Sequence, residues 1–176
     1  SLLRVGIKAV GISGIDGGML KAYRKEKLVI INEKGRKMVI DGGYTGRINS
    51  VDPSLLNIVI EKEYVPVVSP IALSNELDFL NVDGDRAAAY VAGGLKAHSV
   101  ILMTNENGLI LDDKLVTYMT YEQAKMAISK IGFGMQNKVI ASIEALEMGV
   151  REAIIASEKV ENPLSASIAH HNCTMI

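Results

Sequence analysis

The sequence has only one cysteine, Cys173, among its 176 residues. A single cysteine excludes a disulfide within the chain and a metal centre built from several thiolates, and it is typical of proteins that work in a reducing compartment. The simplest interpretation of Cys173 is a small, buried, apolar side chain. We therefore expect a cytoplasmic protein.

The chain also lacks a basic excess and a long apolar run. Its formal net charge is −1 and its isoelectric point about 6.3, so its overall charge does not favour nucleic acid or an anionic membrane as a partner. No stretch approaches the ~18 consecutive apolar residues of a membrane-spanning helix, and the first four residues lack the pattern of a signal peptide. We expect no nucleic-acid partner and no membrane association.

Metal-ligand spacing and internal repeats are absent as well. The histidines at positions 98, 170 and 171 do not combine with other candidates into a ligand set, so no metal-binding residue is predicted. A composition of 48% hydrophobic and 22% charged residues indicates an ordered globular protein with one core. We expect a single domain over residues 1–176, and the apolar opening residues resemble the end of a helix that begins upstream of Ser1.

What the chain does have is an alternation of uniformly apolar strands with helices. The apolar segments lie at residues 8–12, 64–69, 99–104 and 152–157. Such segments are typical of parallel strands that are covered on both faces, which predicts a three-layer α/β/α arrangement around a mainly parallel sheet. Antiparallel hairpins are expected at residues 27–41 and 109–118. Ligands of parallel sheets gather at the carboxyl ends of the strands.

Short polar motifs mark the starts of several helices. Asp52 is predicted to cap a helix whose first turn contains Pro53. Thr120 and Gln123 have the spacing of a capping box. A short helix is expected to start at Asn162-Pro163, and residues 173–176 are expected to form an edge strand.

A glycine-rich turn, SGIDGG at residues 13–18, follows the first apolar strand. Three glycines and a short carboxylate between a strand and a predicted helix make a tight turn whose backbone amides can approach an anion. An ordinary strand-to-helix turn accounts for the same residues equally well.

The segment Asn81–Ala97 places three polar side chains, Asn81, Asp83 and Asp85, before a run of alanines and glycines with helical character. A carboxylate near a helix start suits the positive end of the helix dipole, and the small residues let the helix pack closely. From this segment alone, a helix cap explains Asp83 or Asp85 better than a functional role does. Asp85 is the candidate that we select.

GFGM, at residues 132–135, precedes a helix predicted over residues 136–148. It resembles the opening of a dinucleotide-binding fingerprint, but a helix precedes it where a strand is required, and Asn137 occupies the place of the third glycine. The segment instead puts Lys138 in the first turn of a helix, where a cation opposes the helix dipole and an anionic ligand would offset that cost. A solvated lysine is the alternative.

The order of these blocks resembles a known family. The blocks are AVGISGIDG, GRINSVDPSLL, VPVVSPI, FLNVDGDRAAAYVAGGL, VILMTNENGLILDDKL, GFGMQNKVIASIEAL and NCTMI. Over nearly the whole chain they resemble the acetylglutamate kinase branch of the amino acid kinase family. YTGRINSVD is more similar to the archaeal kinases that act on α-aminoadipate or glutamate attached to an amino-group carrier protein than to the enzymes of free N-acetylglutamate.

The resemblance implies the amino acid kinase fold and an ATP-dependent phosphorylation of a side-chain carboxylate in lysine or arginine biosynthesis, by a homodimer. Bringing two anions together requires positive charge, Mg²⁺ and rigid alignment. Two alternatives stay open: a kinase of free N-acetylglutamate, and a non-catalytic module of the same fold that binds a nucleotide or an amino acid. We expect Lys138 and Asp85 to face a common cavity.

The resemblance also assigns roles to individual residues. Lys138 matches the lysine that stabilises the transition state, Asp85 the aspartate that holds catalytic lysines in place, and Asn81 the asparagine that binds the substrate. The residues that match the nucleotide-binding segments of the family are Asn105, Glu106, Asn107, Gly108, Leu109, Lys130, Ile131, Gly132, Ser13, Gly14 and Asp16.

The chain departs from the family pattern in some places. Members usually have aspartate where Asn105 stands and ISGGM where IGFGM stands, so we expect the nucleotide contacts to differ in detail. The Lys-x-Gly-Gly strand, the phosphate-receiving glycine loop and the substrate-binding arginine of the family would precede Ser1. We therefore expect mostly the nucleotide-binding C-terminal part of the domain, with little activity by itself.

Overall fold

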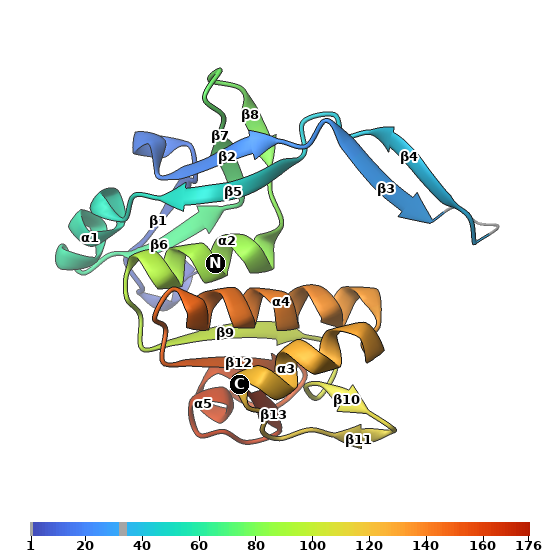
Figure 1. The fold of residues 1–176 in the computed structure, drawn as a ribbon. Coiled ribbons are helices and arrows are strands. Elements are labelled where there is room, and N and C mark those ends of the chain that lie inside the picture. Colours follow the sequence, from blue (N-terminus) through green and yellow to red (C-terminus); the bar gives the residue numbers. More distant parts are fainter. Residues whose placement is uncertain (1, 32–34) are drawn as a thin grey trace. The chain divides into compact units, whose positions relative to one another are not determined.

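The computed structural model describes residues 2–31 and 35–176 (Figure 1). The chain forms two compact units, Ser1–Ala87 and Ala88–Ile176. Helix α2 (Gly84–Gly94) contains the boundary between them. None of the helices in the described part of the chain has the length and apolar character that crossing a membrane requires.

The first unit is rich in strands. Parallel strands β1 and β6 pair with each other, and β5, β2, β7 and β8 form a mixed sheet in that order. Strands β3 and β4 form a separate antiparallel hairpin that projects from this sheet (Figure 1). The elements are η1 (Leu2–Val5), β1 (Ala9–Ser13), η2 (Asp16–Gly18), β2 (Leu20–Arg24), β3 (Lys27–Ile31), β4 (Lys37–Asp41), β5 (Gly46–Val51), α1 (Ser54–Glu61), β6 (Val65–Ser69), β7 (Ile71–Leu73) and β8 (Phe79–Asn81).

The second unit has a three-stranded sheet of order β13-β12-β9, in which β12 is parallel to β9 and antiparallel to β13. Side chains alternate along β12: Ala153 and Ile155 join the core beneath α4, whereas Ile154 and Ala156 pack on the other face with Cys173. The elements are β9 (Ser99–Thr104), β10 (Ile110–Leu111), β11 (Lys114–Leu115), α3 (Tyr121–Ala127), η3 (Ile128–Lys130), α4 (Phe133–Glu147), β12 (Glu152–Ser157), α5 (Pro163–Ile168) and β13 (Cys173–Met175).

This architecture confirms the α/β fold with parallel strands and covering helices. Strands β9 and β12 have the predicted bounds, and both hairpins form. The capping box is also present, because the Gln123 amide donates to Thr120 Oγ1 (3.3 Å) while the Gln123 side chain accepts from the Thr120 amide (2.8 Å). Cys173 is buried in the core, and this burial raises the pKa of its thiol.

Three local predictions are wrong, and each has a physical reason. The SGIDGG turn leads into strand β2 and not into a helix, because Gly17 and Gly18 both have positive φ, at 61° and 67°. The N-cap of α1 is Pro53, one residue later than predicted, although the Asp52 carboxylate still accepts a hydrogen bond from the Ser54 amide (2.9 Å).

The third correction concerns the GFGM segment, whose last three residues belong to a helix and not to a loop. Gly132 is the extended N-cap of α4, and the helix begins at Phe133. Gln136 supports this start, since its side-chain amide donates to the carbonyl of Ile128 (3.0 Å) in the preceding 3-10 turn. Lys138 therefore lies in the second turn of α4, where the helix dipole opposes a cation less than it does in the first turn.

Candidate functional site at the carboxyl ends of the parallel strands

In the two parallel pairs β1–β6 and β9–β12, each of the four strands ends in a residue with a hydroxyl group. Ser13 ends β1 beside Ser69 of β6, and Thr104 ends β9 beside Ser157 of β12. Carboxyl ends of parallel strands are the usual place for ligands in α/β proteins. Sequence reasoning selected only Ser13, although Ser69, Thr104 and Ser157 end the other three apolar segments.

In the first unit, the turn after β1 is held against the end of β6. The Gly14 amide donates to the carbonyl of Ser69 (3.1 Å), and a Cβ atom at Gly14 would lie 2.3 Å from the carbonyl oxygen of Ile71. Only glycine fits this close approach. The Asp16 carboxylate accepts a hydrogen bond from the Ser13 amide (2.7 Å), so Asp16 fixes the backbone of the turn.

The Ser13 hydroxyl is a candidate ligand contact at this edge. Its oxygen is buried and makes no hydrogen bond with any part of the chain that the structure describes. Buried hydroxyls nearly always have a partner, so an oxygen of this kind at a strand end suits a polar ligand group. This is the strongest local sign that the SGIDGG turn has a role beyond connecting two strands.

The segment that contains Asn81 reaches the same edge of the first unit. The Val82 amide donates to the carbonyl of Pro70 (3.2 Å), directly after β6, and the Asn81 amide donates to the carbonyl of Tyr44 (2.8 Å). The structure therefore brings Asn81, whose side chain is exposed, to the strand end that also carries Gly14.

Asp83 and Asp85 occupy different positions at the start of α2. The Asp83 carboxylate accepts a hydrogen bond from the Arg86 amide (3.0 Å), which is the geometry of an N-cap. Asp85 lies in the first turn and is partly buried. The capping role that the sequence left open between the two residues therefore belongs to Asp83.

In the second unit, the loops after β9 and β12 meet. The Glu158 amide donates to the carbonyl of Thr104 (2.8 Å), which holds the two loops together. Residues 105–107 are exposed next to this contact. The loop at residues 158–161 was not selected from the sequence, although it follows an apolar strand just as residues 105–107 do.

Gly108 and Leu109 have a different environment from the three residues before them. Both are buried, and the Leu109 amide donates to Thr174 Oγ1 (2.7 Å), which in turn donates to the carbonyl of Val116 (2.6 Å). The Leu109 side chain belongs to the core. These two residues thus anchor the loop to β13 and, through Thr174, to the segment that follows β11. Asn105, Glu106 and Asn107 are exposed to solvent.

The junction between α3 and α4 lies toward the same end of the second unit. The amino terminus of α4 lies at the end of the sheet to which the arrowheads of β9 and β12 point (Figure 1). Lys130 and Gly132 are exposed here, Ile131 is partly buried, and Lys138 is partly buried one turn further along α4. Lys138 and Asp85 belong to different units, so the predicted common cavity stays a prediction.

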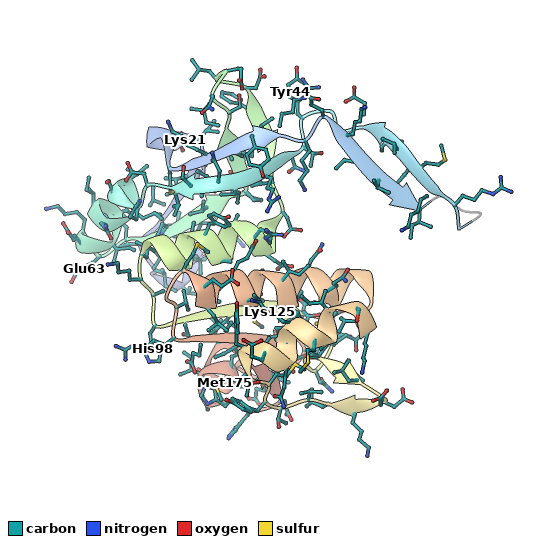
Figure 2. The ribbon with its side chains drawn as sticks, in the orientation of Figure 1. Lys21, Tyr44, Glu63, His98, Lys125 and Met175 are labelled. Carbon is teal, nitrogen blue, oxygen red and sulfur yellow. The ribbon has the colours of Figure 1, made fainter. Side chains whose placement is uncertain are left out.

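The opposite end of the second unit carries a polar cluster that joins α3 to α4. The Tyr121 hydroxyl donates to Glu147 Oε1 (2.6 Å), and the Lys125 ammonium lies 3.4 Å from the same oxygen. The Tyr121 hydrogen bond, with a smaller contribution from Lys125, lowers the pKa of Glu147. His98, labelled in Figure 2, approaches Glu152 at 3.5 Å at this end, and His170 approaches it at 3.0 Å.

Two cavities in the described part of the chain lie away from the predicted site residues. One of about 540 Å³ is lined by residues that include Tyr23, Asp41 and Asp78, and one of about 530 Å³ by residues that include Tyr118 and Arg151. We place the candidate ligand contacts at the strand ends of each unit, because hydroxyl groups and polar or glycine-rich loops lie there in both units. Among residues 2–31 and 35–176, no group of three or more histidine, cysteine, aspartate or glutamate side chains is arranged to hold a metal ion.

Comparison with known proteins identifies close relatives. The chain is 57% identical over 171 residues to a protein of Cenarchaeum symbiosum that carries the name LysW-aminoadipate/LysW-glutamate kinase provisionally, with 97% of this chain and 64% of that protein aligned. It is 40% identical over 169 residues to the LysW-aminoadipate/LysW-glutamate kinase of Metallosphaera sedula, with 96% of this chain and 64% of that protein aligned. The chain thus spans less than two thirds of the length of these curated relatives.

A solved structure supports the fold. N-acetylglutamate synthase from Neisseria gonorrhoeae aligns with 97% of this chain and 38% of its own, with a TM-score of 0.75 and 21% identity. At that identity the likeness concerns the fold alone. The sequence model of the amino acid kinase family matches residues 1–157, which is most of the chain. The chain therefore belongs to the amino acid kinase family.

Proposed function

We propose that the protein transfers the γ-phosphoryl group of ATP to the side-chain carboxylate of α-aminoadipate or glutamate that is attached to an amino-group carrier protein. The observation that carries this proposal is the identity of 57% over 171 residues with the provisionally named kinase, which the 40% identity with the Metallosphaera sedula kinase supports. The polar groups at the strand ends suit a reaction that depends on positioning more than on covalent chemistry.

In this reaction a carboxylate oxygen attacks the γ-phosphorus, the bond from that phosphorus to the β–γ bridging oxygen breaks, and ADP leaves. Lys138 is proposed to stabilise the negative charge on the transferred group, and Asp85 to hold catalytic lysines in place. Asn81, exposed at the strand end of the first unit, is proposed to bind the acceptor through its side-chain amide. The product is an acyl phosphate.

Nucleotide binding is proposed for the strand ends of the second unit and for the SGIDGG turn. The second-unit residues are Asn105, Glu106, Asn107, Gly108, Leu109, Lys130, Ile131 and Gly132, and those of the turn are Ser13, Gly14 and Asp16. Gly108 and Leu109 would act by anchoring the loop, since both are buried. The amino terminus of α4 adds amides and a positive dipole end, which suit phosphate.

Mg²⁺ is proposed to accompany the nucleotide and to neutralise charge on its phosphates. Mg²⁺ in such sites is commonly held by substrate phosphates together with one or two carboxylates. The described residues contain no group of three or more histidine, cysteine, aspartate or glutamate side chains placed to hold a metal ion, so the nucleotide phosphates are proposed to supply most of the ligands. Because the chain belongs to the amino acid kinase family, a homodimer is also proposed.

Trapping of the acyl phosphate with hydroxylamine tests the activity, in a protein that also carries the family segments expected upstream of Ser1. Carrier-linked aminoadipate, carrier-linked glutamate and free N-acetylglutamate should be compared in parallel, and we expect hydroxamate only with the carrier-linked acceptors. Faster reaction with free N-acetylglutamate would favour the other kinase, and ATP binding without any hydroxamate would favour a non-catalytic module.

The lysine variant tests the mechanism. Lys138→Ala should lower the rate of hydroxamate formation by about 100-fold or more, because a charge that stabilises the transition state is lost. Lys62→Ala, at the C-cap of α1, is the matched control and should leave the rate unchanged. Equal rates for the two variants, with both folded by circular dichroism, would exclude the role proposed for Lys138.

A further inference from the structure

The β3–β4 hairpin exposes apolar side chains on both of its faces. Val29 pairs with Val39 on one face, and these side chains are 67% and 62% exposed. Ile30 pairs with Met38 on the other face, and both are also exposed. A two-stranded ribbon is marginally stable in water, and a contiguous exposed apolar surface marks a place of interaction. The hairpin therefore needs a partner.

The outer edge of β4 is open for pairing. The Gly42 amide donates to the carbonyl of Glu26 (2.9 Å), directly beyond the pair Lys27↔Asp41. Hydrogen-bonded and non-hydrogen-bonded pairs alternate in an antiparallel ladder, so the peptide groups of Lys37, Val39 and Asp41 point away from β3. Within the described residues, β4 pairs with β3 alone.

The sequence of this edge strand, KMVID, is complementary to itself when it is read in opposite directions. Antiparallel pairing of two copies about Val39 places Lys37 opposite the partner's Asp41, and the partner's Lys37 opposite Asp41. Apolar residues face one another between these two ion pairs. We propose that β4 is a self-association edge, and that two copies of the chain form a four-stranded sheet of order β3-β4-β4-β3.

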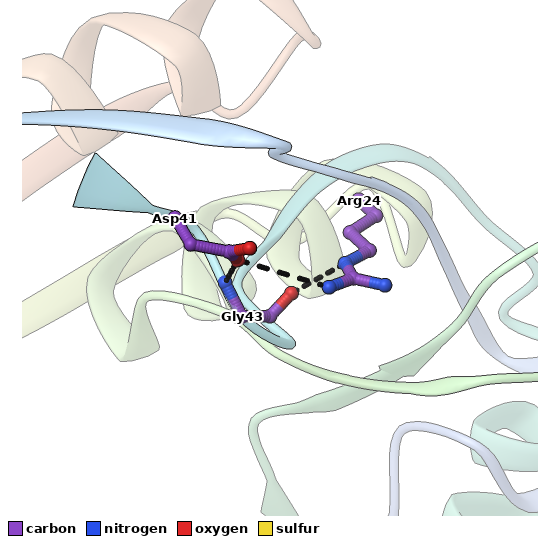
Figure 3. Close-up of polar contacts among 3 residues, drawn as sticks. All are labelled: Arg24, Asp41 and Gly43. Carbon is purple, nitrogen blue, oxygen red and sulfur yellow. Dashed lines mark hydrogen bonds and ion pairs between the residues drawn. The ribbon is translucent and has the colours of Figure 1, made fainter. Parts of the chain in front are cut away.

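The base of the hairpin holds Asp41 in a fixed position (Figure 3). The Asp41 carboxylate accepts a hydrogen bond from the Gly43 amide (2.6 Å) and lies 3.8 Å from the Arg24 guanidinium. Arg24 also donates to the carbonyl of Gly43 and stacks over the ring of Tyr44. The Asp41 side chain is 81% exposed in spite of these contacts, so it can still receive a lysine from another chain.

Charge complementarity favours a second copy over an unrelated partner. A foreign strand would have to match a lysine at one end and an aspartate at the other, whereas a second β4 does so by symmetry, as in any isologous interface. Pairing over the five residues of β4 would bury much less surface than a standard protein–protein interface of about 1,600 Å². We therefore expect a reversible dimer with a dissociation constant in the micromolar range or weaker.

Cysteine cross-linking tests the register. In the proposed dimer Val39 lies opposite the partner's Val39, about 5.5 Å apart between Cα atoms, which is within disulfide range. Val39→Cys should cross-link on mild oxidation, and native Cys173 should not interfere because it is buried. Val29→Cys is the matched control, since it lies on the same face and is equally exposed but belongs to the outer strand. Equal cross-linking of the two variants would overturn the proposal.

Charge reversal tests the ion pairs and does not depend on the kinase activity. Lys37→Glu should weaken the dimer roughly tenfold, since it puts like charges opposite each other twice. Adding Asp41→Lys should restore the affinity, and sedimentation across a concentration series measures both changes. A chain that stays monomeric at all concentrations, or a dimer that neither substitution alters, would overturn the proposal.

Discussion

Asp83 and Asp85 show how two carboxylates in one short segment can occupy different positions relative to a helix. Asp83 precedes α2, so its side chain can turn back to the Arg86 amide, whereas Asp85 is already inside the helix. The sequence contained both possibilities, because either aspartate can cap a helix. The geometry gives the structural role to Asp83 and leaves the proposed catalytic role to Asp85.

Paired substitutions separate these two roles. Asp85→Asn should lower the rate of acyl-phosphate formation by about 100-fold, because the catalytic lysines would lose their anchoring charge. Asp83→Ala should keep the rate but lower the free energy of unfolding by about 1 kcal/mol through loss of the cap. Loss of activity on substitution at position 83, with activity kept on substitution at position 85, would contradict both assignments.

Gly14 is the residue of the SGIDGG turn at which a side chain would meet the closest steric conflict. Gly14→Ala should lower the free energy of unfolding by roughly 1–3 kcal/mol, because the new methyl group would meet the carbonyl oxygen of Ile71 at 2.3 Å. Gly11→Ala, in strand β1 just before the turn, meets nothing within 4 Å and should change stability by less than about 0.5 kcal/mol. Urea unfolding of both variants decides the matter, and equal stabilities would contradict the close approach.

At the scale of elements, the parts that the sequence predicted well are those set by burial. Strands β9 and β12 were predicted to the residue because both faces of each are apolar, and the capping box was predicted because its two side chains have a fixed spacing. The buried position of Cys173 was predicted for the same reason, because a lone cysteine is most often a small, buried, apolar side chain. These features depend on the residues themselves and little on distant packing.

The parts that the sequence missed depend on backbone angles and on contacts between distant segments. Gly17 and Gly18 can take either sign of φ, so the sequence could not exclude a helix after them. The helical start of α4 at Phe133 relies on the contact between Gln136 and the carbonyl of Ile128. Leu109 is anchored by Thr174, which lies 65 positions away in the sequence, and no local sequence pattern predicts this contact.

The link between α3 and α4 should make stability depend on pH. The pKa of Glu147 lies below its ordinary value of 4.5 in the folded protein, so the charged carboxylate stabilises the fold above that pH, and this stabilisation is lost as the pH falls through the folded pKa. Tyr121→Phe removes the largest cause of the shift. It should lower the free energy of unfolding by roughly 0.5–1 kcal/mol at pH 7, since the site is half exposed.

The difference between the wild-type protein and Tyr121→Phe should shrink as the pH falls below 4.5, and urea titrations at several pH values measure it. Tyr118→Phe, an exposed tyrosine three residues earlier, is the matched control and should show no such pH dependence. A constant difference between the wild-type protein and Tyr121→Phe down to pH 3 would show that the hydroxyl acts through packing and not through the carboxylate.

At the scale of the whole molecule, the two compact units repeat one arrangement: a pair of parallel strands ends in hydroxyl residues, and a loop with polar or glycine residues follows. In the second unit, the amino terminus of α4 adds a positive dipole end at the same side. Hydrogen exchange with Mg²⁺ and a non-hydrolysable ATP analogue tests where the nucleotide binds. Protection should rise in residues 105–107, 158–161 and 132–135, because phosphate oxygens would accept hydrogen bonds from backbone amides in these segments.

The same experiment contains its own control regions. The cavity around Tyr118 and Arg151 lies at the opposite end of the second unit, and the β3–β4 hairpin belongs to the other unit, so exchange in both should stay unchanged. Lys138→Ala should reduce the protection near α4 if the ammonium contacts the phosphates. Protection centred on Tyr118, with residues 105–107 unaffected, would move the nucleotide to the amino ends of the strands. It would thereby contradict the placement of the site that the strand directions indicate.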